Sequence, residues 1–274
     1  MSHLHGFKQI VVVPLCLGLI SLAIVPGPGA TKQPLQNASG PATSDLRFIP
    51  PVLSNTAEEP GGRSRGGGSR GDCARYINLT ALAPSITLDQ KEIVLGLTTT
   101  ARPTFWFYVP SELTREAFVE FVLQDRNDNL IYETKFKAAK TPSGIISVRL
   151  PDTAATLEPN RSYQWTLSIY CNPAKPSESS FVQGLIRRVA LKPELQGQID
   201  KTSNPLERAK RYAQAGIWYD ALTILGNSLQ RQGNQDPKLA AAWANLLQQA
   251  GLADIARVPL VPCCRPQGDQ RSGL

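Results

Sequence analysis

The chain has 274 residues with 29 basic and 22 acidic side chains, which leaves a net charge of +7. The excess lies in the two ends, because residues 72–190 carry 13 basic and 12 acidic side chains. No segment concentrates positive charge as a dedicated nucleic-acid binder does, so nucleic acid is not expected as a partner. His3 and His5 are the only histidines. Removal of the segment that holds them would leave the mature chain without the commonest general base and metal ligand. We therefore predict no catalytic residue, cofactor or metal.

Residues 1–30 have the parts of a secretion signal. Lys8 supplies positive charge, residues 10–25 form an apolar run, and small residues follow at Gly27, Gly29 and Ala30. The apolar run is shorter than the ~20 residues that a helix needs to cross a bilayer, so cleavage is favoured over retention as an anchor. We expect export to the periplasm or the extracellular space, with no membrane span after cleavage. Cysteines tend to pair in such an oxidising compartment.

Residues 31–71 are rich in Pro, Gly, Ser and Arg and end in Gly61-Gly-Arg-Ser-Arg-Gly-Gly-Gly-Ser-Arg-Gly71. This composition buries too little apolar surface to offset the entropy of ordering the chain. We predict a disordered linker that acts as a flexible tether. An arginine–glycine tract also suits RNA binding, but export argues against that function.

From residue 72 to 192, short runs of aromatic and β-branched residues recur between turn signals, as is typical of β-strands. The predicted strands are 76–82, 92–97, 104–109, 117–124, 130–136, 145–150, 163–171 and 181–189. Asp125-Arg-Asn-Asp-Asn129 is predicted to be the turn of a hairpin. In the seventh strand Tyr163, Trp165 and Ile169 alternate with polar residues, which indicates one buried face. So many strands within about 120 residues predict a β-sandwich.

One short motif makes this prediction more specific. Leu157-Glu-Pro-Asn-Arg-Ser-Tyr163 has the Leu-x-Pro-x-x-x-Tyr spacing that resembles the tyrosine corner of immunoglobulin-like and fibronectin type III domains. In such domains the tyrosine hydroxyl bonds back to the main chain. We therefore predict a chain that is mainly β with some α, built on an immunoglobulin-like β-sandwich over residues 72–192.

From residue 193 to 262 the apolar pattern takes the period of a helix. Residues 206–216 and 217–226 fit the two antiparallel helices of a tetratricopeptide repeat. Residues 213–221 align with residues 248–256 at an offset of 35, close to the ~34-residue length of that repeat. Two partial repeats are too few for an independent solenoid, so we expect this tetratricopeptide-like segment to pack against the β-domain or a partner. Residues 263–274 are predicted to be a flexible tail.

Four cysteines follow the leader: Cys73, Cys171, Cys263 and Cys264. One interpretation pairs Cys73 with Cys171, which lie at the entry and in the seventh strand of the β-domain. The other bonds Cys263 and Cys264 to Cys73 and Cys171, which would fasten the tail to the β-domain. A bond between the neighbours Cys263 and Cys264 would be strained. A metal or redox site is disfavoured, because the mature chain has neither histidine nor Cys-x-x-Cys.

Phe105-Trp-Phe-Tyr108 is the densest aromatic cluster, and we expect it to pack in the core of the sandwich. Exposed aromatics such as Trp106, Trp218 and Tyr219 would instead suit the stacking of a sugar or a peptide. Residues 125–129 open like a calcium loop, but the sixth and twelfth positions lack the required glycine and glutamate. The chain also lacks a Gly-x-Ser-x-Gly elbow, a phosphate loop and a dinucleotide fingerprint.

Seven motifs lie between residues 71 and 222. They are Gly71-Asp-Cys-Ala-Arg75, Leu79-Thr-Ala-Leu82, Arg102-Pro-Thr-Phe-Trp-Phe-Tyr-Val-Pro110, Phe121-Val-Leu-Gln-Asp125, Tyr163-x-Trp165, Cys171-Asn-Pro173 and Gly216-Ile-Trp-Tyr-Asp-Ala-Leu222. Together they resemble an exported cyanobacterial family that is known as a domain of unknown function, DUF928. The resemblance covers residues 71–262 and implies a place in the cyanobacterial envelope. It implies no catalytic residue, and it favours a role in binding a partner.

These features favour an exported, non-catalytic module that binds another protein of the cell envelope. The alternative is a module that binds carbohydrate or the cell wall through exposed aromatics. A third hypothesis is a hydrolase that uses carboxylates alone, which would need two carboxyl groups about 5–9.5 Å apart in one cleft.

Overall fold

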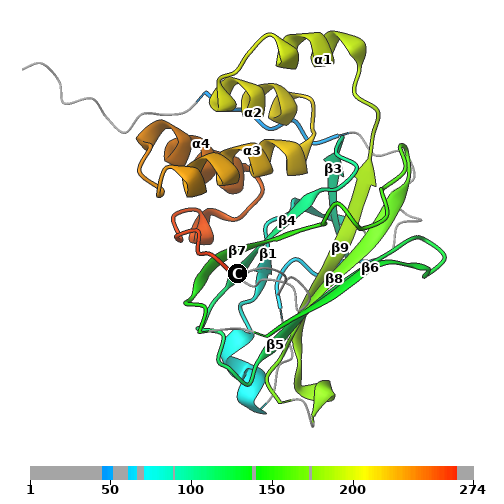
Figure 1. Ribbon diagram of the computed structural model, residues 1–274, viewed down its shortest axis with the longest axis vertical. Coiled ribbons are helices and arrows are strands. Elements are labelled where there is room, and N and C mark those ends of the chain that lie inside the picture. The colour runs from blue at the N-terminus through cyan, green and yellow to red at the C-terminus, as the bar shows by residue number, and fades with distance from the viewer. Residues whose placement is uncertain are drawn as a thin grey trace, which may run out of the picture. The chain divides into compact units, whose positions relative to one another are not determined.

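The computed structural model describes residues 45–51, 61–66, 71–88, 90–137, 140–172 and 175–263. Within these residues the protein is mainly β, with nine strands in two sheets and four α-helices (Figure 1). The predicted leader, the rest of the predicted linker and residues 264–274 lie outside the described residues. None of the helices in the described ranges combines the length and apolarity that crossing a bilayer requires.

The strands are β1 (Thr80–Ala81), β2 (Ser85–Leu88), β3 (Lys91–Thr98), β4 (Thr104–Val109), β5 (Phe118–Gln124), β6 (Leu130–Lys137), β7 (Gly144–Arg149), β8 (Ser162–Tyr170) and β9 (Ser180–Arg188). The α-helices are α1 (Pro193–Asp200), α2 (Pro205–Gln214), α3 (Trp218–Arg231) and α4 (Pro237–Gln249). Short 3-10 helices cover Gly71–Tyr76, Pro176–Glu178 and Ala253–Ile255.

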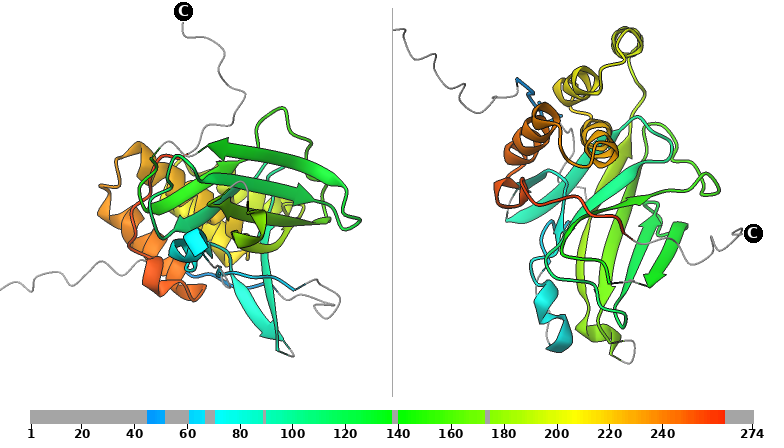
Figure 2. Two further views of the ribbon diagram at one scale, coloured as in Figure 1. Left: turned by 90° about the horizontal axis from the view of Figure 1, so that it is seen from below. Right: turned by 60° about the vertical axis from the view of Figure 1, so that its left-hand side comes forward.

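The strands form a three-stranded sheet in the order β1-β4-β7 and a six-stranded sheet in the order β2-β3-β9-β8-β5-β6. Neighbouring strands are antiparallel, except that β3 and β9 run parallel. Helix α3 packs against β3 and β4. Figures 1 and 2 show α2, α3 and α4 grouped beside these strands. The helices and the sheets therefore form one continuous structure.

Seven of the eight predicted strands are present, with each end within one residue of the predicted bound. The prediction for residues 76–82 is mostly wrong, because Gly71–Tyr76 is a 3-10 helix and only Thr80–Ala81 joins a sheet. Tertiary hydrogen bonds explain the difference. The Tyr76 hydroxyl donates to Glu112 O at 2.7 Å, and the Ser180 hydroxyl donates to Tyr76 O at 2.8 Å. Strand β2 was not predicted, because its four residues are too few for a clear alternation.

Aromatic rings from both sheets fill the core. The ring centroids of Phe105 and Phe121 lie 4.8 Å apart, and those of Phe107 and Trp165 lie 5.6 Å apart. Phe105 and Phe107 come from the three-stranded sheet, whereas Phe121 and Trp165 come from the six-stranded sheet. The predicted packing of this cluster in the core is therefore confirmed for Phe105 and Phe107.

Two predicted turns are present. The Tyr163 hydroxyl accepts a hydrogen bond from the Glu158 N–H at 2.8 Å, which is the backward bond that the Leu-x-Pro-x-x-x-Tyr spacing predicted. Between β5 and β6, the Asp125 carboxylate accepts from the N–H of Asn127 at 2.8 Å and from the N–H of Asn129 at 3.0 Å. Residues 125–129 are thus a hairpin turn that the aspartate side chain closes.

The helical turns at the two aligned segments are built alike. Gly216 and Gly251 have φ of +75° and +76°, which glycine adopts without strain. The Ile217 N–H donates to Tyr212 O and, 35 residues later, the Leu252 N–H donates to Leu247 O, both at 2.9 Å. This bond belongs to the Schellman turn that ends many helices. The second copy is short, because only the 3-10 helix Ala253–Ile255 follows it.

Two pieces of the predicted disordered linker pack against the fold. Backbone hydrogen bonds join Arg63 and Gln183 in both directions, at 2.8 and 3.0 Å, so residues 61–66 run beside β9. Leu46 and Phe48 are buried. The composition of the linker did not indicate these pieces, because backbone hydrogen bonds hold residues 61–66 and only two buried side chains, Leu46 and Phe48, hold residues 45–51. Residues 52–60 and 67–70 lie outside the described residues.

The end of the described chain returns to the three-stranded sheet. The Ile145 N–H donates to Pro259 O and the Val261 N–H donates to Ile145 O, both at 2.9 Å. Residues 259–261 therefore extend this sheet beyond β7. The predicted helical segment 193–262 thus ends in extended chain.

Cys73 and Cys171 form a disulfide with their Cα atoms 5.4 Å apart. It joins the 3-10 helix Gly71–Tyr76 to the end of β8. The first interpretation of the cysteines is therefore confirmed, and the pairing of Cys263 and Cys264 with these two cysteines is excluded. Cys263 is itself disulfide-bonded, and Cys264 lies outside the described residues.

The disulfide should contribute about 2–5 kcal/mol to the free energy of unfolding, as native disulfides of small exported domains do. We expect the double variant Cys73→Ser, Cys171→Ser to lose that amount in chemical denaturation. A non-reducing peptide mass map should contain one fragment that holds both cysteines. Free thiols at both positions in the oxidised protein would contradict the assignment.

The packing of α3 on β4 depends on a glycine. A Cβ built on Gly226 would lie 2.5 Å from the Trp106 ring and 3.0 Å from the Trp243 ring. These two rings meet edge to face with centroids 5.5 Å apart, and both are buried. Neither ring has room to move away from an added methyl group.

Gly226→Ala should lower the free energy of unfolding by about 1–3 kcal/mol through overpacking, although alanine is the better helix former by ~1 kcal/mol. Gly197→Ala in α1 is the matched control, because a Cβ there would meet nothing within 4 Å. The control should be neutral or stabilising in the same urea titration. Equal effects of the two variants would contradict the packing argument.

Candidate binding cleft

The three aromatic residues predicted as exposed binding groups are all buried. Trp106, Trp218 and Tyr219 are 1%, 0% and 2% exposed. The Trp218 indole donates to Leu82 O at 2.8 Å, and the Tyr219 ring meets Phe105 edge-on with centroids 5.4 Å apart. That prediction is corrected: the rings lie between helix α3 and the strands, so they cannot stack an external sugar or peptide.

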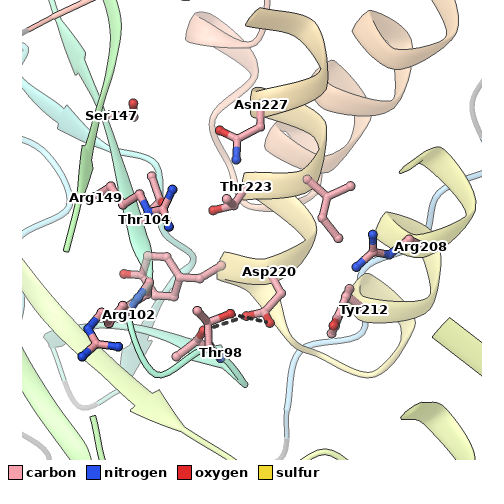
Figure 3. Close-up of a pocket in the computed structure, with 14 residues that line it drawn as sticks. Thr98, Arg102, Thr104, Ser147, Arg149, Arg208, Tyr212, Asp220, Thr223 and Asn227 are labelled. Carbon is pink, nitrogen blue, oxygen red and sulfur yellow. Dashed lines mark hydrogen bonds between the residues drawn. The ribbon is translucent and has the colours of Figure 1, made fainter. Parts of the chain in front are cut away.

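A pocket of about 370 Å³ opens between the strand ends of β3, β4 and β7 and the helices α2 and α3 (Figure 3). Hydroxyl and amide groups make up much of its wall. They belong to Thr98, Thr104, Ser147, Thr223 and Asn227. We call this pocket the polar cleft.

The side chain of Asp220 joins the two sides of the polar cleft. Asp220 lies in the first turn of α3 and is 7% exposed. Its carboxyl group accepts hydrogen bonds from the Thr98 hydroxyl at 2.7 Å, the Thr99 N–H at 3.1 Å and the Thr100 hydroxyl at 3.2 Å. The Thr99 hydroxyl donates a further hydrogen bond to it. Three consecutive threonines at the end of β3 thus hold the carboxyl group, whose charge the start of a helix also favours.

Three arginines line the polar cleft: Arg102, Arg149 and Arg208. None of them forms an ion pair with a carboxylate in the described part of the chain. Arg102 Nε donates to Ala154 O at 3.1 Å. Arg208 Nε is buried without a hydrogen-bond partner, and Arg149 is exposed. Three arginines stand against the one carboxyl group of Asp220 among the described lining residues, so the cleft has an excess of positive charge.

These cleft residues were not predicted from the sequence. One signal was present, because Asp220 is the only acidic residue in the otherwise mainly apolar run 217–225, and a carboxylate at such a position needs a partner when it is buried. The arginines gave no such signal, since they are far apart in the sequence. Within the described residues, no three His, Cys, Asp or Glu side chains gather as a metal site requires.

The family comparison agrees with the motifs. The model of the Domain of Unknown Function DUF928 matches residues 65–260, more than two thirds of the 274 residues. The chain belongs to the DUF928 family. No curated protein matches the chain. The lining of the polar cleft falls inside the DUF928 match, whereas residues 45–51 precede it.

Burial sets the protonation of the carboxyl group in this DUF928 protein. Burial raises the pKa of Asp220 above the ordinary value of 3.8, and the hydrogen bonds from Thr99 and Thr98 oppose this effect only in part. The folded protein therefore favours the neutral carboxyl group more than the unfolded chain does. The contribution of this group to stability is complete below pH 3.8 and is lost as the pH rises through the folded-state pKa.

Asp220→Asn should remove that part of the pH dependence, since an amide does not ionise. We expect the free energy of unfolding of the variant to fall less than that of the parent as the pH rises from about 4 to 7. Urea denaturation across this range measures the difference, and parallel profiles would contradict it. Asp220→Ala should cost about 1–3 kcal/mol, because it leaves buried donors without an acceptor.

Proposed function

We propose that the protein is an exported, non-catalytic interaction module of the cell envelope, and that the polar cleft receives an acidic group of a protein partner. The observation that carries this proposal is the set of three arginines without carboxylate partners, among the described residues, around one pocket. Guanidinium groups bind carboxylates through two parallel hydrogen bonds. The threonines and Asn227 of the wall provide further hydrogen-bonding groups for a polar ligand.

The arrangement of carboxyl groups supports binding over hydrolysis in this cleft. Asp220 is the single carboxylic acid among the lining residues that the structure describes. A carboxylate-based hydrolase would need a second one at about 5–9.5 Å. Asp220 itself is engaged with Thr98, Thr99 and Thr100.

An acidic carbohydrate is the second candidate ligand. The hydroxyl groups of Thr104 and Ser147 and the amide of Asn227 line the cleft beside the arginines. Such groups suit the hydroxyls of a sugar, and arginine suits a uronic acid or a sulfate. This candidate no longer depends on the buried aromatic residues.

The proposed location rests on the sequence of the leader and on the resemblance of the motifs to an exported cyanobacterial family. Residues 1–30 combine a basic start, an apolar run and small residues. The disulfide between Cys73 and Cys171 is compatible with an oxidising compartment.

We further propose that the two sheets are a variant of the immunoglobulin-like sandwich. Strand β8, which carries the Tyr163 hydrogen bond, lies between β5 and β9. In immunoglobulin domains the strand with the tyrosine corner likewise lies between two neighbours of one sheet. The repeated turns at Gly216 and Gly251 support a tetratricopeptide-like origin of the helices.

Arg149→Glu in the full mature chain should weaken binding of the acidic envelope partner by tenfold or more. Hydrogen bonds to charged groups contribute about 1.5–3 kcal/mol, and ~1.4 kcal/mol corresponds to a tenfold change in affinity. Arg115→Glu is the matched control, because it makes the same charge change at an exposed arginine outside the cleft. Affinity for the protein that the parent chain captures from envelope extract is measured by calorimetry.

Equal losses in the two variants, or no loss in Arg149→Glu, would contradict the proposal. Raising the salt concentration should weaken binding to the parent chain, because exposed charges are screened. Capture of an acidic polysaccharide in place of a protein would favour the second candidate.

A further inference from the structure

Residues 45–51, Asp-Leu-Arg-Phe-Ile-Pro-Pro, lie on the helices without forming a helix or strand of their own (blue in Figure 1). Leu46 and Phe48 are 3% and 6% exposed, whereas Asp45, Arg47 and Ile49 are exposed. This alternation is that of an extended chain with one face on a surface. The segment therefore has the form of a bound peptide.

The side-chain amide of Gln249, at the end of α4, holds the main chain of this segment. Its nitrogen donates to Leu46 O at 3.0 Å, and its oxygen accepts from the Phe48 N–H at 2.8 Å. The same amide nitrogen donates to the Asn245 side-chain oxygen at 2.6 Å, which fixes its orientation. An amide that both donates and accepts offers the segment the same bonds as a neighbouring strand. Such contacts recognise an extended backbone whatever its sequence.

The last turn of α2 also contacts the main chain of the segment. The Ile49 N–H donates to Ala213 O at 3.1 Å. A Cβ built on Gly216 would lie 2.8 Å from Ile49 O, so glycine there leaves room for the backbone of the segment. The side chain of Gln249 in α4 and the Ala213 carbonyl near the end of α2 therefore hold the main chain of the segment at two points.

Side-chain contacts add sequence preference at three positions. The Phe48 ring meets the Trp218 ring edge to face, with centroids 5.0 Å apart. Leu46 is 3% exposed and belongs to the same core cluster. Asp45 forms an ion pair with Lys210, which Glu207 also contacts at 2.9 Å. The groove thus selects an acidic residue, a leucine and, two residues further on, a phenylalanine.

The residues of the groove lie inside the part of the chain that the DUF928 model matches, whereas the segment that fills the groove lies outside it. Lys210, Ala213, Trp218 and Gln249 all lie within residues 65–260, which the DUF928 model matches, whereas residues 45–51 lie before them. In the sequence, 201 residues separate Phe48 from the glutamine that holds it. The groove therefore lies within the residues that the family model matches, and the segment that fills it lies before them.

We propose that α2, α3 and α4 form a peptide-binding groove, that residues 45–51 occupy it within the same chain, and that its ligand in trans is an extended peptide of the pattern acidic-Leu-x-Phe. This groove shares no residue with the polar cleft. Peptide binding in the groove therefore does not depend on the proposed binding of an acidic partner in the polar cleft. The segment acts as a competitor, because a ligand within the same chain has an effective concentration of about millimolar. A peptide in trans binds fully only when the tethered segment is weakened.

The test uses the full chain and a fluorescein-labelled synthetic peptide with the sequence of residues 43–51. The variant Leu46→Ala, Phe48→Ala removes the two buried side chains of the tethered segment. We expect fluorescence anisotropy to show about tenfold or tighter peptide binding by this variant than by the parent chain, because the competitor is weakened. Adding Gln249→Ala should reverse most of this gain. Arg47→Ala is the matched control and should bind like the parent, because that side chain is exposed.

A peptide with alanine in place of its leucine and phenylalanine should not bind. Near-ultraviolet circular dichroism checks that each variant is folded. If Leu46→Ala, Phe48→Ala does not fold, Asp45→Lys, which breaks only the ion pair with Lys210, replaces it and should give a smaller gain in the same direction. A folded variant that does not bind the labelled peptide, or a gain that survives Gln249→Ala, would overturn the proposal.

Discussion

The hydrogen bonds between Asp220 and the three threonines after β3 couple the helical layer to the sheets. Four donors from these threonines surround the buried carboxyl group. A shift of α3 relative to the end of β3 would leave these buried polar groups without hydrogen-bond partners, which is costly. Asp220 lies in the first turn of α3, so this contact joins the start of α3 to the residues that follow β3. The start of α3 in turn places Trp218 beneath Phe48 and turns Thr223 and Asn227 toward the arginines. The groove and the polar cleft therefore depend on one shared point of attachment, although they lie on different residues.

Close packing between α3 and the strands adds to the effect of these hydrogen bonds. Gly226 lets Trp106 and Trp243 approach α3, and a Cβ on Gly96 would lie 2.6 Å from the Tyr219 ring. Large rings thus face glycines across the boundary between helix and strand. Such an arrangement buries much apolar area while the layers stay close. It also explains why aromatic residues in this protein build the interior instead of a binding platform.

The sequence predicted local structure well and long-range structure poorly. Alternation along a strand is a local signal, so β3 to β9 were predicted to within one residue. The repeated turns at Gly216 and Gly251 were also visible, because helix ends have their own residue preferences. Tyr76 was misjudged, since its partners Glu112 and Ser180 are distant in the sequence.

The candidate sites were the least predictable part, for the same reason. Asp220 and its threonines are about 120 residues apart, and Gln249 lies 201 residues from Phe48. Neither pair forms a motif that a single sequence can reveal. Tertiary packing likewise determines that Trp106 and Trp218 are buried, and no local sequence pattern predicts it. The pairing of Cys73 with Cys171 was one of two alternatives until the structure brought the two cysteines together.

The strand-like addition of residues 259–261 to β7 has a consequence for biosynthesis. A chain is synthesised from its N-terminus. More than a hundred residues are therefore added after Ile145 before its backbone partners Pro259 and Val261 are made. Such non-local pairing slows folding and leaves a sheet edge open in the meantime. The nascent protein therefore passes through a period in which β7 has a bare edge, and a chaperone that shields exposed strands would be most useful during that interval.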